Sequence, residues 1–274
     1  IPPSIPFVIY GTITGAPIGD LFLAGIIPGI IATICYIFVS YIYVKKHNII
    51  IKTDKVNLNR LTRSFSQAIW GLLMPIIILG GIYSGIFTPT EAAVVAVVYS
   101  LFVGIFIYKE LNFKNMSKMF LSAGLTTSMV MMLIAMASLF GWIMTIENVP
   151  QTIGAAVLSI ANSKWTFLLL LNIVYLFAGM YLDTTAIILL LVPIFFPIAT
   201  QLDINLVHLG LITVFNLAVG QITPPFGVCL FVSSGITGIS IERITKEILP
   251  YLCIAIVLIM LFTYIPSISL FLTK

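Results

Sequence analysis

A single acidic residue lies deep inside a long apolar stretch of the sequence. Asp183 stands in the middle of residues 165–200, in the run from Met180 to Thr185. An ionisable group in such surroundings is costly to bury, so it indicates a functional site by default. Two interpretations stay open: Asp183 only caps the helix that begins after it, or it caps that helix and also contributes to an ion or substrate site.

A second group of oxygen-bearing residues precedes a pair of adjacent prolines, in the run Asn216–Pro225. Paired prolines remove two backbone N–H donors and unwind a helix, which would expose carbonyl groups near Gly220 and Thr223. Asn216 and Thr223 would add side-chain oxygens. Neutral oxygens with few carboxylates suit Na⁺ better than Ca²⁺, whose sites gather several carboxylates. The pattern predicts either a sodium site or a purely structural kink.

The elements that position these residues must be membrane helices. Apolar residue types make up 60% of the 274 residues, charged types make up only 8%, and the mean hydropathy is +1.17. A soluble domain carries about 25% charged residues, and a helix of about 20 apolar residues spans a bilayer. Because apolar segments fill almost the whole chain, we expect an all-α polytopic membrane protein with no room for a separate catalytic domain.

The basic residues are clustered, and their positions indicate membrane topology rather than nucleic-acid binding. Six lie in 45–64, three lie in 109–118, and Arg243 and Lys246 form a third cluster. If 165–200 enters and leaves the membrane on the same side, 11 of the 13 basic residues face the cytoplasm. If 165–200 were one plain span, the third cluster would lie outside. Charge bias therefore favours a re-entrant hairpin at 165–200 and a periplasmic C-terminus.

Residues 2–28 and 224–250 form an internal repeat. The matching positions lie 222 residues apart and are Pro2-Pro3 with Pro224-Pro225, Asp20 with Glu242, and Pro28 with Pro250. In the topology above the two copies run in opposite directions, and inverted repeats with broken helices are typical of secondary transporters. Four residues of the first copy would then form the remnant of a symmetry-related first site, or part of a substrate cavity: Pro3, Ser4, Thr12 and Thr14.

The residue inventory argues against an enzyme. An intramembrane aspartyl enzyme needs two carboxylates that share a proton, and only Asp183 qualifies. A zinc enzyme of the membrane needs a His-Glu-x-x-His helix, which the sequence does not contain. The alternative to a transporter is a channel-like or purely structural membrane subunit without ion coupling.

Three runs of the sequence closely resemble the large membrane subunit of TRAP (tripartite ATP-independent periplasmic) transporters: Ile1–Gly11, Gly85–Ala93 and Asn216–Gly227. The resemblance implies a sodium symporter of the bacterial inner membrane that imports an organic acid by an elevator mechanism. It also implies two partners, a small four-helix membrane subunit and a periplasmic binding protein that delivers the substrate. Sialic acid and C4-dicarboxylates are the substrates that the resemblance suggests, with a slight preference for sialic acid.

The same resemblance assigns positions along the chain. A hairpin tip at Asp183, Thr184 and Thr185 and a broken helix at 205–239 would together form one sodium site, completed by Asn216, Gly220, Thr223 and Pro224. Residues 1–19 would end a first broken helix, 20–118 would be largely scaffold, 119–239 would be the second-repeat transport region, and 240–274 would be the final span. The first hairpin and the first sodium site would lie in an N-terminal third that precedes these residues.

Overall fold

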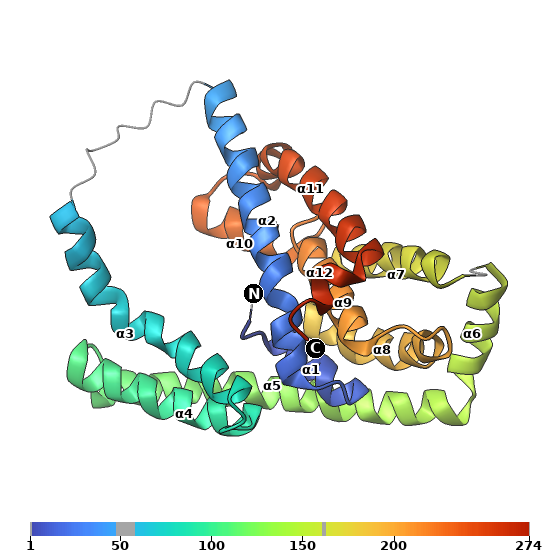
Figure 1. Ribbon diagram of the computed structural model, residues 1–274, viewed down its shortest axis with the longest axis horizontal. Helices are drawn as coiled ribbons and strands as arrows, with labels where there is room; N and C mark the ends of the chain where they lie inside the picture. The colour runs from blue at the N-terminus through green and yellow to red at the C-terminus, as the bar shows by residue number, and fades with distance from the viewer. Residues whose placement is uncertain (1, 48–57, 161–162, 274) are drawn as a thin grey trace. The chain divides into compact units, whose positions relative to one another are not determined.

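The computed structural model describes residues 2–47, 58–160 and 163–273, and within these ranges every regular element is a helix (Figure 1). In chain order the helices are α1 (Ile5–Thr14), α2 (Ile18–Lys46), α3 (Leu58–Tyr83), α4 (Pro89–Phe102), the π-helical segment η1 (Val103–Ile107), α5 (Phe113–Ile146), α6 (Val149–Ile160), α7 (Lys164–Gly179), α8 (Thr184–Gln201), α9 (Leu206–Gly220), α10 (Val228–Thr237), α11 (Ile241–Tyr264) and α12 (Pro266–Leu270). Ile1 and Lys274 lie outside the described ranges, as do Lys52 and Lys55 of the basic cluster in 45–64.

The helix lengths confirm the predicted polytopic, all-α class. In the described ranges six stretches are long and apolar enough to cross a membrane: α2, α3, α4 continued by η1, most of α5, α8 and α11. Helices α1, α7, α9 and α10 are also apolar but have only 10–17 residues. These four are too short to span alone, because a spanning helix needs about 20 residues. They flank the predicted hairpin tip and the predicted helix breaks.

Contacts divide the chain into two compact units, a small unit (His47–Met131) and a large unit (Ile1–Lys46 with Met132–Lys274). In the small unit the Tyr99 hydroxyl of α4 donates to the Trp70 carbonyl of α3 at 2.7 Å. A capping box starts α4: the Thr88 N–H donates to Glu91 Oε2 at 2.8 Å, and the Glu91 N–H donates to Thr88 Oγ1 at 3.3 Å.

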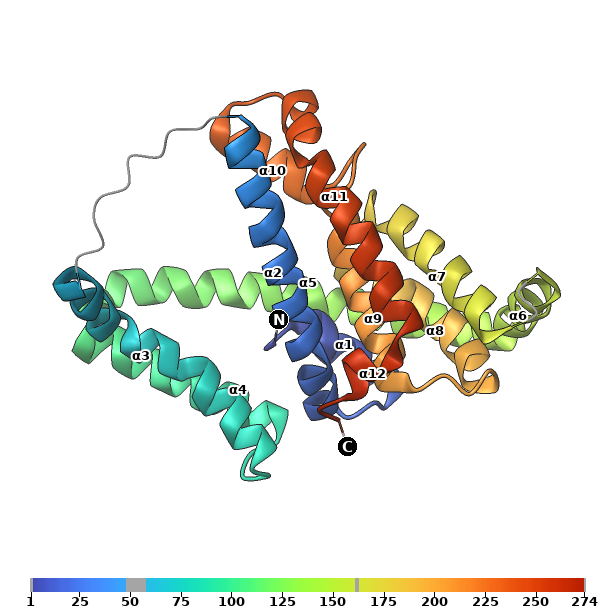
Figure 2. The same cartoon turned by 45° about the horizontal axis from the view of Figure 1, so that its top comes forward.

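Helix α9 lies at the centre of the large unit, between α7, α2, α1, α8, α11 and α12 (Figure 2). A helix that is apolar on all sides is stable only when it is buried, and α9 is buried along most of its length. Gly210 permits this packing, because a Cβ there would lie 2.6 Å from side-chain atoms of both Tyr10 and Leu21. The Tyr10 hydroxyl donates to the Leu206 carbonyl at 2.9 Å and joins α1 to the start of α9.

The internal repeat is visible in the fold. Helices α1 and α10 each have 10 residues and each end at a glycine in the left-handed region, Gly15 with φ 73° and Gly238 with φ 69°. Such a conformation favours glycine, which has no Cβ to clash. A long helix follows in both copies and carries a proline, Pro28 in α2 and Pro250 in α11. Both Pro-Pro peptide bonds that precede the repeats, Pro2-Pro3 and Pro224-Pro225, are cis.

The two copies run in opposite directions. The Tyr36 and Tyr251 rings lie 6.2 Å apart, Ser40 Oγ lies 2.9 Å from Tyr251 Oη, and the Tyr43 hydroxyl donates to Glu247. Residue numbers rise along α2 while those of its partners fall along α11, so the two helices are antiparallel. The repeats are therefore inverted, as predicted.

Residues 165–200 form a helical hairpin built from α7 and α8. The Lys164 Nζ donates to the Asp203 carbonyl at 3.0 Å, so the start of α7 lies beside the end of α8. The Trp165 and Tyr264 rings lie 5.6 Å apart, so this end of the hairpin also lies beside the C-terminal end of α11. The hairpin tip, Met180–Asp183, lies between the two arms at their other end.

Candidate functional site

Asp183 begins the second arm of the hairpin. Its Oδ2 accepts the Thr185 N–H at 2.8 Å, which makes Asp183 the N-cap of α8. Thr184 is buried directly beneath it, and Asp183 itself is exposed. The capping role considered from sequence is therefore present, and it uses one of the two carboxylate oxygens.

The break after α9 is a tight backbone turn. The Thr223 N–H donates to the Gly220 carbonyl at 2.9 Å, and the Gly227 N–H donates to the Thr223 carbonyl at 3.2 Å. A Cβ at Gly227 would lie 2.5 Å from the Gln221 carbonyl oxygen, so only glycine fits there. The carbonyls expected to be exposed at Gly220 and Thr223 thus each accept one hydrogen bond within the turn and keep one lone pair.

The hairpin tip and the break meet through two glycines. A Cβ built on Gly220 would lie 2.7 Å from the Gly179 Cα, and one built on Gly179 would lie 3.0 Å from the Gly220 Cα. Gly179 is the last residue of α7 and Gly220 the last of α9. Two helix C-termini, each with partial negative charge from its terminal carbonyls, therefore lie in direct backbone contact.

Gln221 joins the break after α9 to the hairpin tip, although it is not among the site residues predicted from the sequence. Its Nε2 donates to Thr184 Oγ1 at 2.7 Å and to Asp183 Oδ1 at 3.4 Å. Its carbonyl accepts the Cys229 N–H at 3.1 Å, which fixes the start of α10 to the end of α9. The only signal in the sequence is its place directly after Gly220, inside the run that precedes the paired prolines.

Asn216 lies one helical turn before Gly220, in a buried amide pair with Asn172 of α7. Its Nδ2 donates to Asn172 Oδ1 at 2.9 Å and to the Asn172 carbonyl at 3.1 Å, and Asn172 Nδ2 donates to Thr263 Oγ1 at 2.9 Å. Asn216 Oδ1 and Thr213 Oγ1 are buried and have no hydrogen-bond partner among the described residues. Asn172 was also missed from sequence, although it is the one amide in the apolar run of α7.

The predicted sodium-site residues therefore fall into two groups. The first group is Asp183, Thr184 and Thr185 of the tip with Gly220 of α9. They lie where Gly179 contacts Gly220 and Gln221 bonds to Thr184, a place called the tip–break junction below. Thr223 and Pro224 belong to the turn, where the Thr223 hydroxyl donates to the Val219 carbonyl of its own helix at 2.7 Å. Asn216 is bonded to α7 and not to the tip.

The residues predicted for a first site do not converge. Thr12 Oγ1 donates to the Ile9 carbonyl at 2.8 Å and Thr14 Oγ1 to the Tyr10 carbonyl at 2.9 Å, both in their own helix. Ser4 lies before the opposite end of α1, about 15 Å from Thr14 at 1.5 Å per helical residue. Pro3 is exposed beside Ser4.

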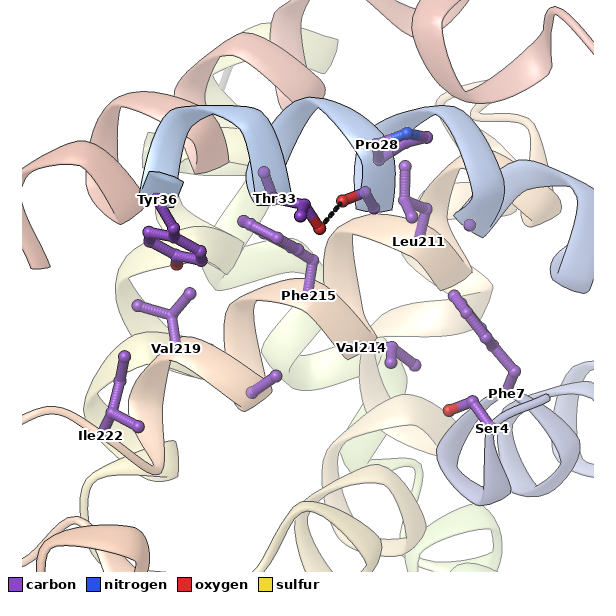
Figure 3. A pocket seen from close by; sticks show the side chains of 14 residues that line it. Ser4, Phe7, Pro28, Thr33, Tyr36, Leu211, Val214, Phe215, Val219 and Ile222 are labelled. Atoms are coloured by element: carbon purple, nitrogen blue, oxygen red, sulfur yellow. Dashed lines mark hydrogen bonds between the residues drawn. The ribbon is translucent and has the colours of Figure 1, made fainter. Parts of the chain in front are cut away.

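A cavity of about 360 Å³ lies between α2 and α9 and reaches Ser4 at one end and Ile222 at the other (Figure 3). Its walls are mostly apolar, with Phe7, Phe215 and Val219 among the side chains that Figure 3 labels. None of the described residues that line it is cationic. Among the first-site candidates Ser4 lines this cavity, whose described lining residues carry no charge to pair with an organic acid.

The described residues contain no cluster of three or more His, Cys, Asp and Glu that could hold a metal ion. The oxygen atoms at the tip–break junction are one carboxylate, neutral side-chain oxygens and backbone carbonyls. Such a set does not match a zinc site, which takes nitrogen and sulfur ligands, or a calcium site with several carboxylates.

Comparison with known proteins agrees with this architecture. The family model described as "Tripartite ATP-independent periplasmic transporter, DctM component" matches residues 1–268. The chain is 46% identical over 270 residues to a C4-dicarboxylate TRAP transporter large permease protein of Pseudomonas aeruginosa, a match that covers 98% of this chain and 63% of the relative. It is 41% identical over 271 residues to an isethionate TRAP transporter permease protein of Oleidesulfovibrio alaskensis, covering 99% of this chain and 43% of the relative.

A third relative is the sialic acid TRAP transporter large permease protein of Vibrio cholerae, 37% identical over 274 residues, with 100% of this chain and 64% of the relative covered. The chain thus spans between 43% and 64% of the length of these three relatives. All three are named as transporter permeases and none as an enzyme. The chain belongs to the DctM-component family of tripartite ATP-independent periplasmic transporters.

Proposed function

We propose that this chain is part of a sodium-coupled importer that carries a small organic anion across the bacterial inner membrane. The hairpin and the broken helix would move together as an elevator. A periplasmic binding protein would deliver the anion, and a small four-helix membrane subunit would complete the complex. The C-terminus would face the periplasm.

The observation that supports a cation site best is the meeting of α7 and α9 at Gly179 and Gly220. Each helix end contributes about half an elementary negative charge from its carbonyls. The Asp183 carboxylate adds a further charge within reach of the same junction through Gln221. Ends of half-helices and unwound carbonyls coordinate Na⁺ in transporters with inverted repeats.

The ligand types favour a monovalent ion. Asp183, Thr184 and the carbonyls of the turn supply one full charge and several neutral oxygens. Asp183 is the one carboxylate among these oxygens, whereas calcium sites gather several carboxylates. Na⁺ is the coupling ion that this donor set fits.

The substrate class follows from the relatives and from the chemistry of the break. The named substrates of the three relatives are a C4-dicarboxylate, isethionate and sialic acid, all small anions. The N-cap of α10 is Gly227, which supplies no side-chain cap, and half-helix N-termini receive anionic groups in such folds. The higher identity to the C4-dicarboxylate relative makes a dicarboxylate, rather than sialic acid, the first anion to test.

The test is uptake of radiolabelled anion by proteoliposomes that contain the full-length permease, its small subunit and the binding protein. We expect uptake to need an inward sodium gradient and to fall to background when choline replaces Na⁺ outside. Uptake that is unchanged in choline would refute sodium coupling. Ionic conductance without coupled accumulation would favour the channel-like alternative.

A further inference from the structure

The antiparallel pair of α2 and α11 brings two separate basic clusters to one end of the large unit. Tyr43 of α2 bonds to Glu247 of α11, and the pairing runs toward the end of α2 and the start of α11. Lys45 and Lys46 stand within the turn that follows Tyr43, and Arg243 stands one turn before Glu247. Figures 1 and 2 both show the end of α2 beside the start of α11.

A groove of about 540 Å³ lies at this end of the pair. Apolar side chains form most of its wall, with one arginine and one carboxylate: Ile239, Arg243, Ile244, Glu247, Ile248 and Tyr251. The Tyr43 hydroxyl donates to the Glu247 carboxylate, which gives that carboxylate a partner inside the protein. Arg243 is exposed.

Positive charge dominates the rim. Lys45, Lys46, Arg243 and Lys246 are all exposed, and within the described part of the chain no ion pair joins any of them to a carboxylate. Two carboxylates lie near these four cations, Glu247 and the exposed Glu242 in the first turn of α11, so the cations outnumber the carboxylates. A row of cations beside an apolar groove at the end of membrane helices is complementary to a molecule with an anionic head and a hydrocarbon tail.

We propose that this groove binds an anionic phospholipid. The lipid phosphate lies against Arg243, whose guanidinium can bond two phosphate oxygens at once. Lys246 and the lysines at the end of α2 add attraction at the rim. An acyl chain packs along Ile239, Ile244 and Ile248. An acidic protein segment would match the charges but would leave the isoleucine wall without a hydrocarbon partner.

The experiment is native mass spectrometry of the purified full-length protein in neutral detergent, titrated separately with phosphatidylglycerol, phosphatidylcholine and inorganic phosphate. We expect retained phosphatidylglycerol and little retained phosphatidylcholine. Each cation removed should weaken phosphatidylglycerol binding about fivefold, from the attraction of a surface Lys or Arg to anionic lipid. The variants are Arg243→Gln and the double variant Arg243→Gln with Lys246→Gln.

The matched control is Arg63→Gln, an exposed arginine of α3 in the small unit. It removes the same charge, so it should leave phosphatidylglycerol binding unchanged if the groove is the site. A thermal melt without added lipid checks that each variant is folded. Equal binding to Arg243→Gln and to the unmodified protein would overturn the proposal, as would equal retention of the two lipids. If the small membrane subunit displaces the lipid, and Arg243→Gln weakens the binding of that subunit, the groove binds a protein partner and the lipid proposal is wrong.

Discussion

The contact between Gly179 and Gly220 makes a quantitative prediction for Gly220→Ala. The added methyl group would lie 2.7 Å from the Gly179 Cα and 2.9 Å from its carbonyl carbon. Carbon atoms pack at about 3.5–4.0 Å, so the hairpin tip and the end of α9 must separate by roughly 1 Å. Both obstructing atoms are backbone, and a rotamer change cannot relieve the clash.

The size of the effect follows from the cost of overpacking. Added methyl groups in a packed site cost about 1–3 kcal/mol, while Gly to Ala within a helix returns about 0.5–1 kcal/mol. The gain from the helical alanine is the same with and without bound Na⁺, so it cancels from the sodium affinity. The overpacking cost falls on the sodium-bound state, in which the tip and the end of α9 must stay in contact. A free-energy change of about 1–3 kcal/mol corresponds to a 5–150-fold loss of sodium affinity.

The assay is the sodium concentration that gives half-maximal uptake by the reconstituted full-length transporter. Gly235→Ala in α10 is the matched control, because no atom lies within 4 Å of the added Cβ. We expect Gly220→Ala to raise the half-saturating sodium concentration within the stated range and Gly235→Ala to leave it unchanged. If Gly220→Ala is folded and has unchanged sodium dependence, the junction is a packing contact and not an ion site.

Three further predictions concern stability and are measured as the thermal unfolding midpoint of the full-length protein in detergent. Tyr10→Phe removes the 2.9 Å bond to the Leu206 carbonyl and should cost about 1 kcal/mol; an unchanged midpoint would show that this bond adds nothing. Thr88→Ala breaks the capping box of α4 and should also cost about 1 kcal/mol, while Thr88→Ser should retain it. Asn172→Leu removes the side-chain oxygen that accepts from Asn216 Nδ2 and leaves that amide only the backbone carbonyl of residue 172, so it should cost about 1–3 kcal/mol. Adding Asn216→Leu should restore part of the loss, and additive losses would contradict the pairing.

Local signals in the sequence predicted the elements well. The start of α4 is readable in this way, because the four residues Thr88-Pro89-Thr90-Glu91 that form its capping box are adjacent in the chain. The hairpin followed from a global constraint, since a plain span would have put Arg243 and Lys246 on the side opposite the other basic clusters. The inverted repeat followed from matching prolines 222 positions apart, and the structure adds the matching left-handed glycines that end α1 and α10.

Contacts between distant helices could not be predicted in the same way. Gln221 and Asn172 act through partners 37 and 44 positions away, and spacing along one helix does not say which residue of another helix it faces. Asn216 is predicted to share a sodium site with Gly220 because both lie in the run before the paired prolines. The structure shows in addition that its amide nitrogen, one helical turn before Gly220, bonds to Asn172 of α7.

The hydroxyls of Thr12 and Thr14 bond within their own helix, and such bonds compete with binding an ion or a substrate. Ser and Thr in apolar helices satisfy their hydroxyls by bonding to carbonyls three or four residues earlier. Thr12 and Thr14 both do so. Oxygen-bearing residues near a proline pair are therefore weak evidence for a site unless a second element brings oxygens to the same place.

The most direct test of a sodium site at the tip–break junction is the sodium dependence of uptake by Asp183→Asn in the complete transporter. Asparagine caps a helix about as well as aspartate, so this variant keeps the cap of α8 and removes only the charge. The account predicts a half-saturating sodium concentration at least about tenfold higher, since interactions with a charged group contribute about 1.5–3 kcal/mol. A folded Asp183→Asn variant with unchanged sodium dependence would contradict it and leave Asp183 as a helix cap alone.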